Sequence, residues 1–422
     1  MSTFSDSSNH STIEFGTDGI RGPYGIFPLD SPSLERIARC IVSYTHTHAP
    51  HATIAIARDT RYSGEEISHI LSDIVHKHGL QVMDFGIIPT AALACAVIDT
   101  GAYIGIMITA SHNPATDNGI KLFNRHGEKF TPQEKEAFSR CFDQDISNYL
   151  STTGSYKVAN NPSAPWKRRL PMIDLTGWKI LVDCAHGAIS NLAEDILEQY
   201  GATTISVASS PNGHNINDNV GALHPPTILE DCDIALCFDG DADRLILVSA
   251  QGILDGDDIL WLLQKHIDGP LVGTIMSNGG LDSATDHRLH RSKVGDQNVF
   301  ELMRKVDAKI GAEPSGHIIF RDGNMPSGDG LYAALRVLKH LQRPISISWQ
   351  RWPSAQSSVQ FSSSFPKPKI EDLQEYQRAL ATGHRLVVRY SGTEPKLRIL
   401  VEGPDAQYWC DAVATEFRQY IT

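Results

Sequence analysis

Apolar runs of strand length alternate with longer amphipathic stretches through most of the chain. Runs typical of buried strands, rich in β-branched residues, occur at residues 53–57, 104–108, 179–182, 203–207, 234–238, 245–248 and 271–275. Stretches with helical periodicity occur at residues 65–77, 189–200, 299–305 and 330–341. This order predicts an α/β architecture with largely buried sheets.

Residues 91–110 are apolar enough to suggest a membrane span. Asp99, Thr100 and Gly101 interrupt the stretch, however. The pattern therefore predicts a helix at residues 91–98, a turn, and a buried strand at residues 103–108 that presents Ser111 at its carboxyl end. We expect no association with a membrane.

The chain is predicted to divide into four domains. Pro- and Ser-rich stretches at residues 160–165 and 353–368 are typical of linkers or of the edges of folding units. We predict three similar mixed α/β domains and a smaller C-terminal α+β domain, at residues 1–160, 161–256, 257–347 and 348–422. Polar motifs directly follow apolar strands in several of these units, and such strand ends carry ligands in open α/β sheets. The domains are therefore expected to surround a central cleft.

Composition excludes several classes of partner. A net charge of −12 over 422 residues leaves no basic stripe for a nucleic-acid backbone, so no nucleic-acid partner is expected. The seven cysteines include no Cys-x-x-Cys pair, which fits a reduced, cytoplasmic protein. The first fourteen residues are polar and lack the apolar core of a signal peptide. The oligomeric state is not decided, and a homodimer is left open.

Three carboxylates stand at alternate positions in the run DGDADR, residues 239–244. Asp239, Asp241 and Asp243 would repel one another unless a cation or several positive groups neutralised them. Carboxylate oxygens suit Mg²⁺ or Ca²⁺. The run is not an EF-hand loop, because Arg244 and Ala250 stand where that loop needs Gly and Glu. Apolar strands on both sides argue against a merely solvated acidic loop.

Ser111 lies in the run TASHNP, residues 109–114, at the end of a predicted strand. A cation held by three aspartates can take one more anionic ligand, and a phosphate carried by Ser111 would supply it. The pairing of such a serine with a cation site predicts phosphoryl transfer.

The loop GAEPSGH at residues 311–317 follows a strand-like stretch at residues 308–310. Glu313, Ser315 and His317 could together hydrogen-bond the vicinal hydroxyls of a sugar. A plain turn is an equally good interpretation of this loop alone.

The loop RYSGTEP at residues 389–395 follows another predicted strand. An arginine, two hydroxyls and consecutive backbone N–H groups around a glycine predict a phosphate-binding nest, to which Arg398 adds charge. A simple strand-turn-strand is the alternative.

Two basic residues stand close to these loops along the chain. Arg21 lies in the glycine-rich run FGTDGIRG, residues 15–22, and Lys121 follows Ser111 in the run NGIK, residues 118–121. Both are expected in the cleft. A Walker A loop, a Gly-x-Gly-x-x-Gly fingerprint and a His-Glu-x-x-His motif are absent from the sequence, so nucleotide cofactors and zinc hydrolysis have no support.

Together and in this order, the motifs resemble those of the α-D-phosphohexomutase superfamily, and most of all its bacterial phosphoglucosamine mutase branch. The resemblance covers nearly the whole chain, residues 15–403. The similarity to the branch comes from FGTDGIRG and from three further runs: NIN at residues 215–217, MSN at residues 276–278 with Gly280-Leu281, and KVGD at residues 293–296.

The resemblance implies a four-domain, heart-shaped molecule around a deep cleft. It implies the interconversion of glucosamine 6-phosphate and glucosamine 1-phosphate, for UDP-N-acetylglucosamine and peptidoglycan precursors. Ser111 would be the phosphorylated catalytic residue, and a hexosamine 1,6-bisphosphate would be the intermediate and activator. Mg²⁺ would be bound by the Ser111 phosphate and by Asp239, Asp241 and Asp243.

For the other loops, the resemblance implies that Glu313 and Ser315 contact sugar hydroxyls, with His317 beside them. The non-reacting phosphate would be held by Arg389, Ser391, Gly392 and Thr393, next to Arg398. Arg244 would offset charge on the transferring group. The hydroxyl proton would be handled by Lys121, Arg21 or His112, and the sequence does not choose among them.

Some positions depart from the pattern of the branch. Ala312 and Pro314 replace a glycine and a glutamine beside the glutamate, Gln297 and Asn298 replace Arg-Tyr after KVGD, and Ala242 replaces a frequent glycine. The first two changes lie near the sugar loop, so a phosphomannomutase or phosphoglucomutase is the alternative function.

Two other classes are weighed against these enzymes. A Mg²⁺-dependent phosphatase would phosphorylate an aspartate and would leave the loop around Arg389 unexplained. A catalytically silent sugar-phosphate binder would have no need of Ser111, the aspartates and Arg389 together.

Overall fold

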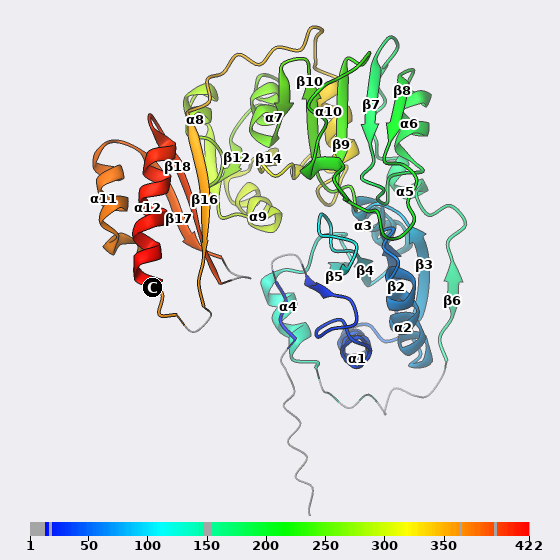
Figure 1. The fold of residues 1–422 in the computed structure, drawn as a ribbon. Helices are drawn as coiled ribbons and strands as arrows, with labels where there is room; N and C mark the ends of the chain where they lie inside the picture. Colours follow the sequence, from blue (N-terminus) through cyan, green and yellow to red (C-terminus); the bar gives the residue numbers. More distant parts are fainter. Residues whose placement is uncertain are drawn as a thin grey trace, which may run out of the picture.

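The computed structural model describes residues 13–16, 19–142, 144, 146, 153–362, 365–391 and 395–421. Four β-sheets follow one another along these residues, each with its own helices (Figure 1). The first three sheets mix parallel and antiparallel strands, whereas the fourth is antiparallel. The predicted α/β class with a smaller C-terminal α+β part is confirmed. We call the sheets with their helices the first to fourth units; each sheet lies inside one predicted domain, whose limits stay a prediction.

The first unit is built on a six-stranded sheet with the order β1-β5-β4-β2-β3-β6. Strand β5 runs antiparallel to both β1 and β4, and the other neighbours are parallel. The strands are β1 (Ile20–Pro23), β2 (Thr53–Arg58), β3 (Gln81–Ile87), β4 (Ile104–Ile108), β5 (Asp117–Asn124) and β6 (Tyr156–Val158). The helices are α1 (Ser31–His48), α2 (Gly64–Lys77), α3 (Thr90–Thr100) and α4 (Pro132–Ser139).

The two faces of this sheet carry different side chains, because strand residues alternate in direction. On β2, Ile54 and Ile56 pack into an apolar cluster with α1 and α2. Ala55 and Ala57 belong instead to the cluster that contains α3. Small side chains on this second face let the alanine-rich α3 lie close to the strands.

The second unit has the strand order β11-β10-β9-β7-β8, and the third has β13-β12-β14-β15. The second contains β7 (Lys179–Asp183), β8 (Thr203–Val207), β9 (Ile234–Phe238), β10 (Leu245–Ser249), β11 (Gly252–Leu254), α5 (Ala164–Lys167), α6 (Ala193–Gln199) and η2 (Gly221–Leu223). The third contains β12 (Leu271–Thr274), β13 (Leu289–Ser292), β14 (Ile310–Ala312), β15 (Ile318–Phe320), α7 (Gly256–Leu263), η3 (Gln264–His266), α8 (Gly280–Ala284), α9 (Asp296–Val306) and α10 (Gly330–Leu338).

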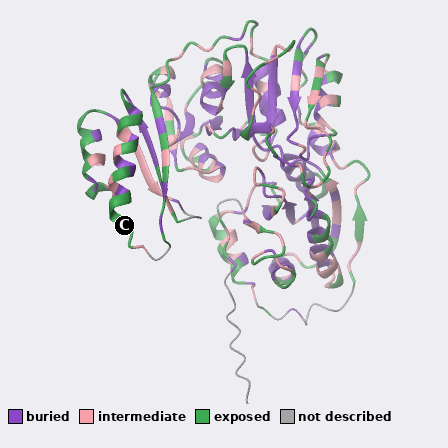
Figure 2. Ribbon diagram, in the orientation of Figure 1, coloured by how far each residue is buried: buried purple, intermediate pink, exposed green. Residues whose placement is uncertain are grey.

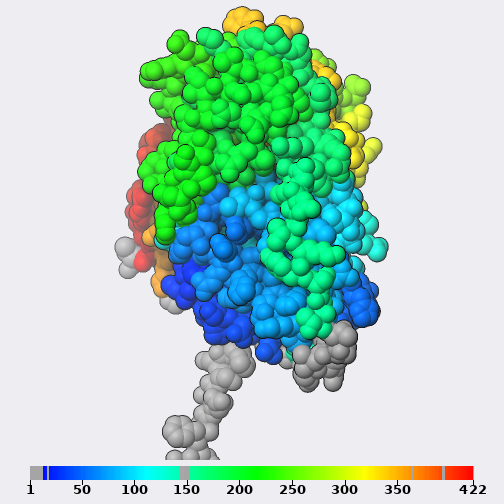
Figure 3. Space-filling view, turned by 90° about the vertical axis from the view of Figure 1, so that its right-hand side faces the viewer, coloured from blue at the N-terminus to red at the C-terminus, as the bar shows by residue number. Residues whose placement is uncertain are grey.

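The fourth unit is a three-stranded sheet, β16-β18-β17, packed against two helices. It contains β16 (Ser354–Gln360), β17 (Arg385–Tyr390), β18 (Lys396–Glu402), η4 (Ile370–Asp372), α11 (Gln374–Ala381) and α12 (Ala406–Ile421). This unit has its own apolar core, whereas one large core extends from α3 through the second and third units (Figure 2). Seen from the side, the first and second units form one continuous surface (Figure 3).

Several element boundaries differ from the expected ones: α9 begins at Asp296, three residues early, α10 ends at Leu338, three residues early, and two further differences have a local cause. Helix α6 begins at Ala193, because residues 187–192 form turns in which Ser190 Oγ donates back to a carbonyl at 2.7 Å. Strand β14 begins at Ile310, two residues later than the start of the expected strand-like stretch. The preceding helix ends in a left-handed residue, Asp307 (φ 57°), and pairing with β12 starts only at Ile310.

The Pro- and Ser-rich stretch at residues 353–368 is not only a linker, because it contains the edge strand β16. Ala355 and Val359 point into the core of the fourth unit, with serine and glutamine between them. Because the apolar side chains are few and short, the alternation of apolar and polar residues is too weak to predict a strand.

The apolar stretch at residues 91–110 forms the expected helix and strand, α3 and β4. Among the described residues, no helix is both long and apolar enough to cross a membrane. Helix α3 is instead covered by protein, between the first sheet and the core of the next two units.

Gly105 on β4 is a point of close approach to α3. A Cβ atom at this position would lie 2.5 Å from Val97 Cγ2, so we expect Gly105→Ala to lower the free energy of unfolding by about 1–3 kcal/mol. Val97→Ala removes the clashing methyl group, so the double variant should lose less than the sum of the two single variants. Urea unfolding followed by circular dichroism measures both effects. Additivity within about 0.5 kcal/mol would contradict this packing.

Candidate active site

Ser111 follows β4 in the left-handed region of the backbone (φ 53°), which costs a non-glycine residue about 1–2 kcal/mol. Its amide donates to Thr109 Oγ1 (2.8 Å), and Thr109 Oγ1 donates in turn to Asp59 Oδ2 (2.6 Å). The Ser111 hydroxyl donates to Asp239 Oδ2 at 2.6 Å. The turn therefore directs the Ser111 side chain at the aspartate run of the second unit.

Arg61 and Asn217 hold the carbonyl oxygens of the serine loop. Arg61 Nη2 donates to Ser111 O (2.9 Å) and Asn113 O (2.8 Å), while its Nε pairs with Asp59 Oδ2 (2.9 Å). Asn217 Nδ2, from the second unit, donates to Ser111 O (2.8 Å). Asp59 and Arg61 were not predicted from the sequence, although they lie in the first three residues after strand β2, a position like that of the other motifs.

The three aspartates lie buried on the turn between β9 and β10. One oxygen of each carboxylate lies within 4.8 Å of those of the other two. Burial, followed by the charges of Asp243 and Asp241, raises the pKa of Asp239 to about 6. Asp241 Oδ1 is buried and has no hydrogen-bond partner among the described residues. The cluster thus keeps a buried carboxylate oxygen without a hydrogen bond from the described part of the chain, although cationic side chains approach other oxygens of the cluster.

Lys121 brings a positive charge into this cluster from β5 of the first unit. Its Nζ donates to Asp241 Oδ2 (2.6 Å) and to Asp243 Oδ2 (2.9 Å). Burial opposes the ionisation of Asp243, but Lys121 and His317 hold the pKa of this carboxyl well below its usual range. Hard carboxylate donors with an unpaired buried oxygen fit Mg²⁺.

His112 and Arg244 are further polar groups near the Ser111 hydroxyl or its partner Asp239, and the charge of Arg21, on β1, acts on His112. His112 Nδ1 lies 3.4 Å from Ser111 Oγ. Burial and then the charges of Arg244 and Arg21 lower the pKa of His112 to about 3, so its ring is neutral near pH 7. The Arg244 amide donates to Asp239 Oδ1 (3.2 Å), and its Nε lies 3.6 Å from Asp239 Oδ2. A ring with so low a pKa is a weak base, so its position beside Ser111 and not its basicity keeps it a candidate.

The GAEPSGH run connects β14 to β15. Glu313 is buried, its Oε2 accepts from the Gly295 amide (2.9 Å), and its Oε1 lies 3.4 Å from His317 Nδ1. His317 Nε2 lies 3.1 Å from Asp243 Oδ1. Burial alone would lower the pKa of His317, but Asp243 and Glu313 raise it to about 10. This imidazolium joins Glu313 to the aspartate cluster, whereas Ser315 is exposed in the turn.

A cavity of about 520 Å³ lies between the third and fourth units. Its lining includes Arg389, Lys396 and Arg398 of the fourth unit and Met276 and Val294 of the third. Arg389 and Arg398 are opposite each other on β17 and β18. Burial, followed by the charge of Arg398, lowers the pKa of Arg389. An anion in the cavity would relieve this repulsion. Lys396 was missed in the sequence, although it alternates with Arg398 along one strand.

The rest of the arginine loop is only partly described. Ser391 is buried, and its amide donates to Lys396 O (2.8 Å) where β17 turns toward β18. Gly392 and Thr393 lie outside the described residues, so the phosphate contacts expected of them stay a prediction.

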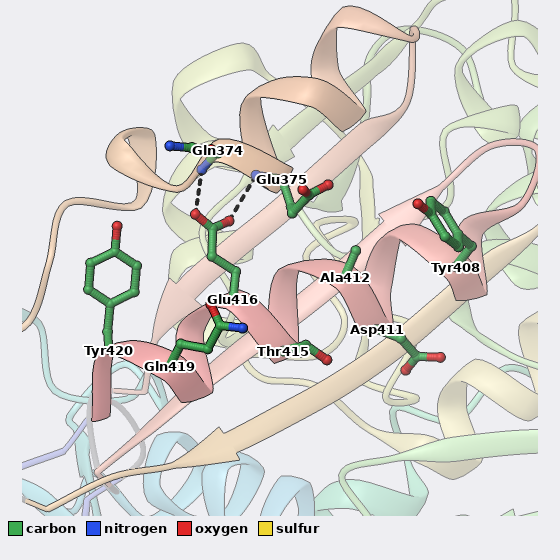
Figure 4. Close-up of a pocket in the computed structure, with 9 residues that line it drawn as sticks. All are labelled: Gln374, Glu375, Tyr408, Asp411, Ala412, Thr415, Glu416, Gln419 and Tyr420. Carbon is green, nitrogen blue, oxygen red and sulfur yellow. Dashed lines mark hydrogen bonds between the residues drawn. The ribbon is translucent and has the colours of Figure 1, made fainter. Parts of the chain in front are cut away.

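A larger cavity, of about 690 Å³, lies on the fourth unit beside α11 and α12 (Figure 4). Its charged lining residues are acidic: Glu375, Asp411 and Glu416. The Glu416 carboxylate accepts from the amides of Gln374 (2.7 Å) and Glu375 (2.8 Å), and so caps α11. Carboxylates disfavour a phosphorylated ligand, so this cavity is not the candidate site.

Comparison with known protein families gives a match along most of the chain. All four matching families are described as phosphoglucomutase/phosphomannomutase. The alpha/beta/alpha domains I, II and III match residues 12–148, 166–252 and 255–351, and the C-terminal domain matches residues 365–419.

Two curated relatives are similar over nearly their full length. The phosphoglucosamine mutase of Aliarcobacter butzleri is 35% identical, covering 95% of this chain and 97% of that protein. The phosphoglucosamine mutase of Chelativorans sp. is 36% identical, covering 93% and 94%.

Solved structures share the fold at lower identity. A phosphoglucomutase/phosphomannomutase family protein from Burkholderia thailandensis has a TM-score of 0.76 at 22% identity, covering 97% of both chains. Aspergillus fumigatus N-acetylphosphoglucosamine mutase, in complex with GlcNAc-6P and magnesium, has a TM-score of 0.66 at 16% identity, covering 98% of this chain and 96% of that one.

Arg61→Lys keeps the positive charge but cannot serve several carbonyls of the serine loop at once. We expect sugar-phosphate turnover to fall about 10- to 100-fold, because a small displacement of Ser111 misaligns the reacting groups. Steady-state kinetics of the purified variant measure this. Arg58→Lys is the matched control, since the Arg58 guanidinium approaches the exposed Glu65 at 3.7 Å and, among the described residues, donates no hydrogen bond to the serine loop. Equal turnover in the two variants would contradict a role for Arg61 in orienting the loop.

Proposed function

The chain belongs to the phosphoglucomutase/phosphomannomutase family, and from this premise we propose that it interconverts glucosamine 6-phosphate and glucosamine 1-phosphate. The curated relatives described above are named phosphoglucosamine mutases and align over almost the whole chain. The observation that carries the proposal is the 2.6 Å contact between Ser111 Oγ and Asp239 inside a buried carboxylate cluster.

Ser111 is the proposed carrier of the phosphoryl group. The bond from Ser111 Oγ to phosphorus breaks as the free hydroxyl of the sugar monophosphate bonds to phosphorus and releases its proton to a base. The product is a hexosamine 1,6-bisphosphate. After this intermediate turns over in the site, its other phosphoryl group bonds to Ser111 Oγ, and the sugar oxygen that it leaves regains a proton.

The charged residues around Ser111 have separate proposed roles. Asp239, Asp241 and Asp243 would hold Mg²⁺, which when bound offsets charge on a transferring phosphoryl group. Arg244 would add a second positive charge on that side. His112, Lys121 and Arg21 remain the candidates for the proton transfers.

The two ends of the sugar phosphate would be held by different units. Glu313, buried beside His317, would accept hydrogen bonds from vicinal hydroxyls. Arg389 and Arg398 would hold the non-reacting phosphate in the 520 Å³ cavity, where neighbouring cations favour an anion. Because both phosphate positions of the sugar must react in turn, a single binding site for the non-reacting phosphate serves both orientations of the bound sugar.

A phosphomannomutase or phosphoglucomutase is the second candidate. Ala312 and Pro314 flank Glu313, and these residues differ from the pattern expected for a glucosamine-specific loop. The reaction would be the same, with another hexose. A homodimer and a cytoplasmic setting also stay predictions.

Ser111→Ala removes the proposed phosphoryl carrier. We expect mutase turnover to fall by roughly a thousandfold or more, as when the nucleophile of a covalent mechanism is deleted. Intact-mass spectrometry should show the mass of one phosphoryl group on the wild type and none on the variant. Ser283→Ala is the control, since Ser283 Oγ only donates to a carbonyl of its own helix at 3.2 Å. Full activity of Ser111→Ala, with release of inorganic phosphate, would favour an aspartyl phosphatase instead.

The hexose preference separates the two candidate mutases. We expect kcat/KM for glucosamine 6-phosphate to exceed the values for glucose 6-phosphate and mannose 6-phosphate by at least about tenfold, because a polar group matched by the site is discriminated strongly. Parallel kinetics on the three substrates measure the ratio. A preference for glucose or mannose would replace the proposed substrate and keep the mechanism.

A further inference from the structure

Polar contacts join the first unit to the N-terminal end of α9 in the third unit. Lys129 Nζ pairs with Asp296 Oδ2 at 2.6 Å. The Gln297 side chain makes two contacts: its Nε2 donates to Phe130 O (2.6 Å), and its Oε1 accepts from Lys135 Nζ (2.9 Å). Lys129, Asp296 and Gln297 also line a small cavity between the two units.

The same helix end holds Glu313. Gly295, the N-cap of α9, donates its amide to Glu313 Oε2 at 2.9 Å. Gly295 has a φ of 116°, a conformation that residues with a side chain rarely adopt. The direction of the Gly295 N–H bond therefore depends on the backbone conformation of Gly295 and on the position of the first turn of α9. Gln297, two residues on, lies in that turn.

The contacts continue from Glu313 back to the first unit. Glu313 lies 3.4 Å from His317, His317 lies 3.1 Å from Asp243, and Asp243 accepts from Lys121 at 2.9 Å. Lys121 belongs to β5. Phe123 of the same strand forms a β-bridge with Lys129, and Phe130 is the next residue along the chain. The first unit thus touches both ends of one chain of polar contacts.

We propose that Gln297 is a positioning residue that fixes the Glu313 carboxylate by tying the start of α9 to the first unit. It acts through the Gly295 amide and does not touch the reacting groups. The inference rests on the proposed function in taking Glu313 to hold sugar hydroxyls. In addition, Glu313 has the orientation needed to bind these hydroxyls only when the first unit is packed against α9.

The chemistry of the glutamine side chain supports this role. A primary amide donates and accepts at once, so it can satisfy the Phe130 carbonyl and the Lys135 ammonium together. An arginine at this position would donate to the carbonyl but would face the ammonium of Lys135. Lys135 also donates to Gly16 O at 3.1 Å, which extends the contact to the glycine-rich run that contains Arg21.

Gln297→Ala removes both contacts and tests the proposal. We expect KM for the sugar phosphate to rise about tenfold with kcat changed less than about twofold. Hydrogen bonds to the sugar hydroxyls that are equally strong in the ground state and the transition state affect KM alone. Gln297→Glu keeps the contact to Lys135 and should be intermediate. The dissociation constant of inorganic phosphate, which has no sugar hydroxyls for Glu313 to bind, should stay at the wild-type value.

Arg304→Ala is the matched control, because Arg304 also reaches the first unit from α9, at 3.5 Å from Glu128, but from the last turn of the helix, far from Gly295. It should leave KM unchanged. Amide hydrogen exchange at residues 294–298 gives a readout that does not need activity, and it should become faster in Gln297→Ala only. Unchanged exchange and KM in Gln297→Ala, or equal changes in Arg304→Ala, would overturn the proposal. A wild type without mutase turnover would contradict the proposed function, while the exchange measurement would still decide this inference.

Discussion

Three buried carboxylates within 4.8 Å of one another are the constraint on which the rest of the structure depends. Charges of one sign removed from water are tolerated only when positive groups approach them closely. The turn that carries Asp239, Asp241 and Asp243 cannot supply enough of these groups itself. Lys121 from the first unit and His317 from the third complete the arrangement. Electrostatics at one turn therefore requires that three units meet around it.

The strand ends make this meeting possible. Strands β4, β9 and β14 each finish in a polar loop, and parallel or mixed sheets present such ends along one edge. The shared apolar core behind them, from α3 into the third unit, holds the three edges in place. Rigid apolar packing and the polar centre thus support each other: the core fixes distances, and the charges select which loops can lie together.

The acidic and the basic side chains of the candidate site lie in different parts of the molecule. The acidic centre lies among the first three units, and the arginine cavity between the third and the fourth. In the proposed reaction, a phosphorylated sugar would need both: carboxylates to hold a cation at the reacting phosphate, and cationic side chains at the distant one. The third unit contributes to both regions, which gives α9 and the Glu313 loop their central place.

The sequence predicted most of this site because the chemistry is local. Alternating carboxylates, a serine at a strand end and an arginine loop are each contained in a few residues, and strands bounded by apolar runs are recognisable from periodicity alone. The strand β16 escaped recognition since serine and glutamine weaken its alternation. Arg61 and Asp59 escaped because Arg61 holds main-chain carbonyls of another loop and Asp59 holds Arg61, which leaves no pattern of residue types along the chain.

By itself, then, the sequence determined which residues can do chemistry and in which order the elements occur, because side-chain type and hydrophobic period are properties of single segments. Only the tertiary structure decided which charges face one another. The pairing of Lys121 with aspartates over a hundred residues later, the bond from Gly295 to Glu313 and the docking of Gln297 on the first unit depend on distances through space. Those distances are set by the packing of whole sheets, which no short stretch of sequence encodes.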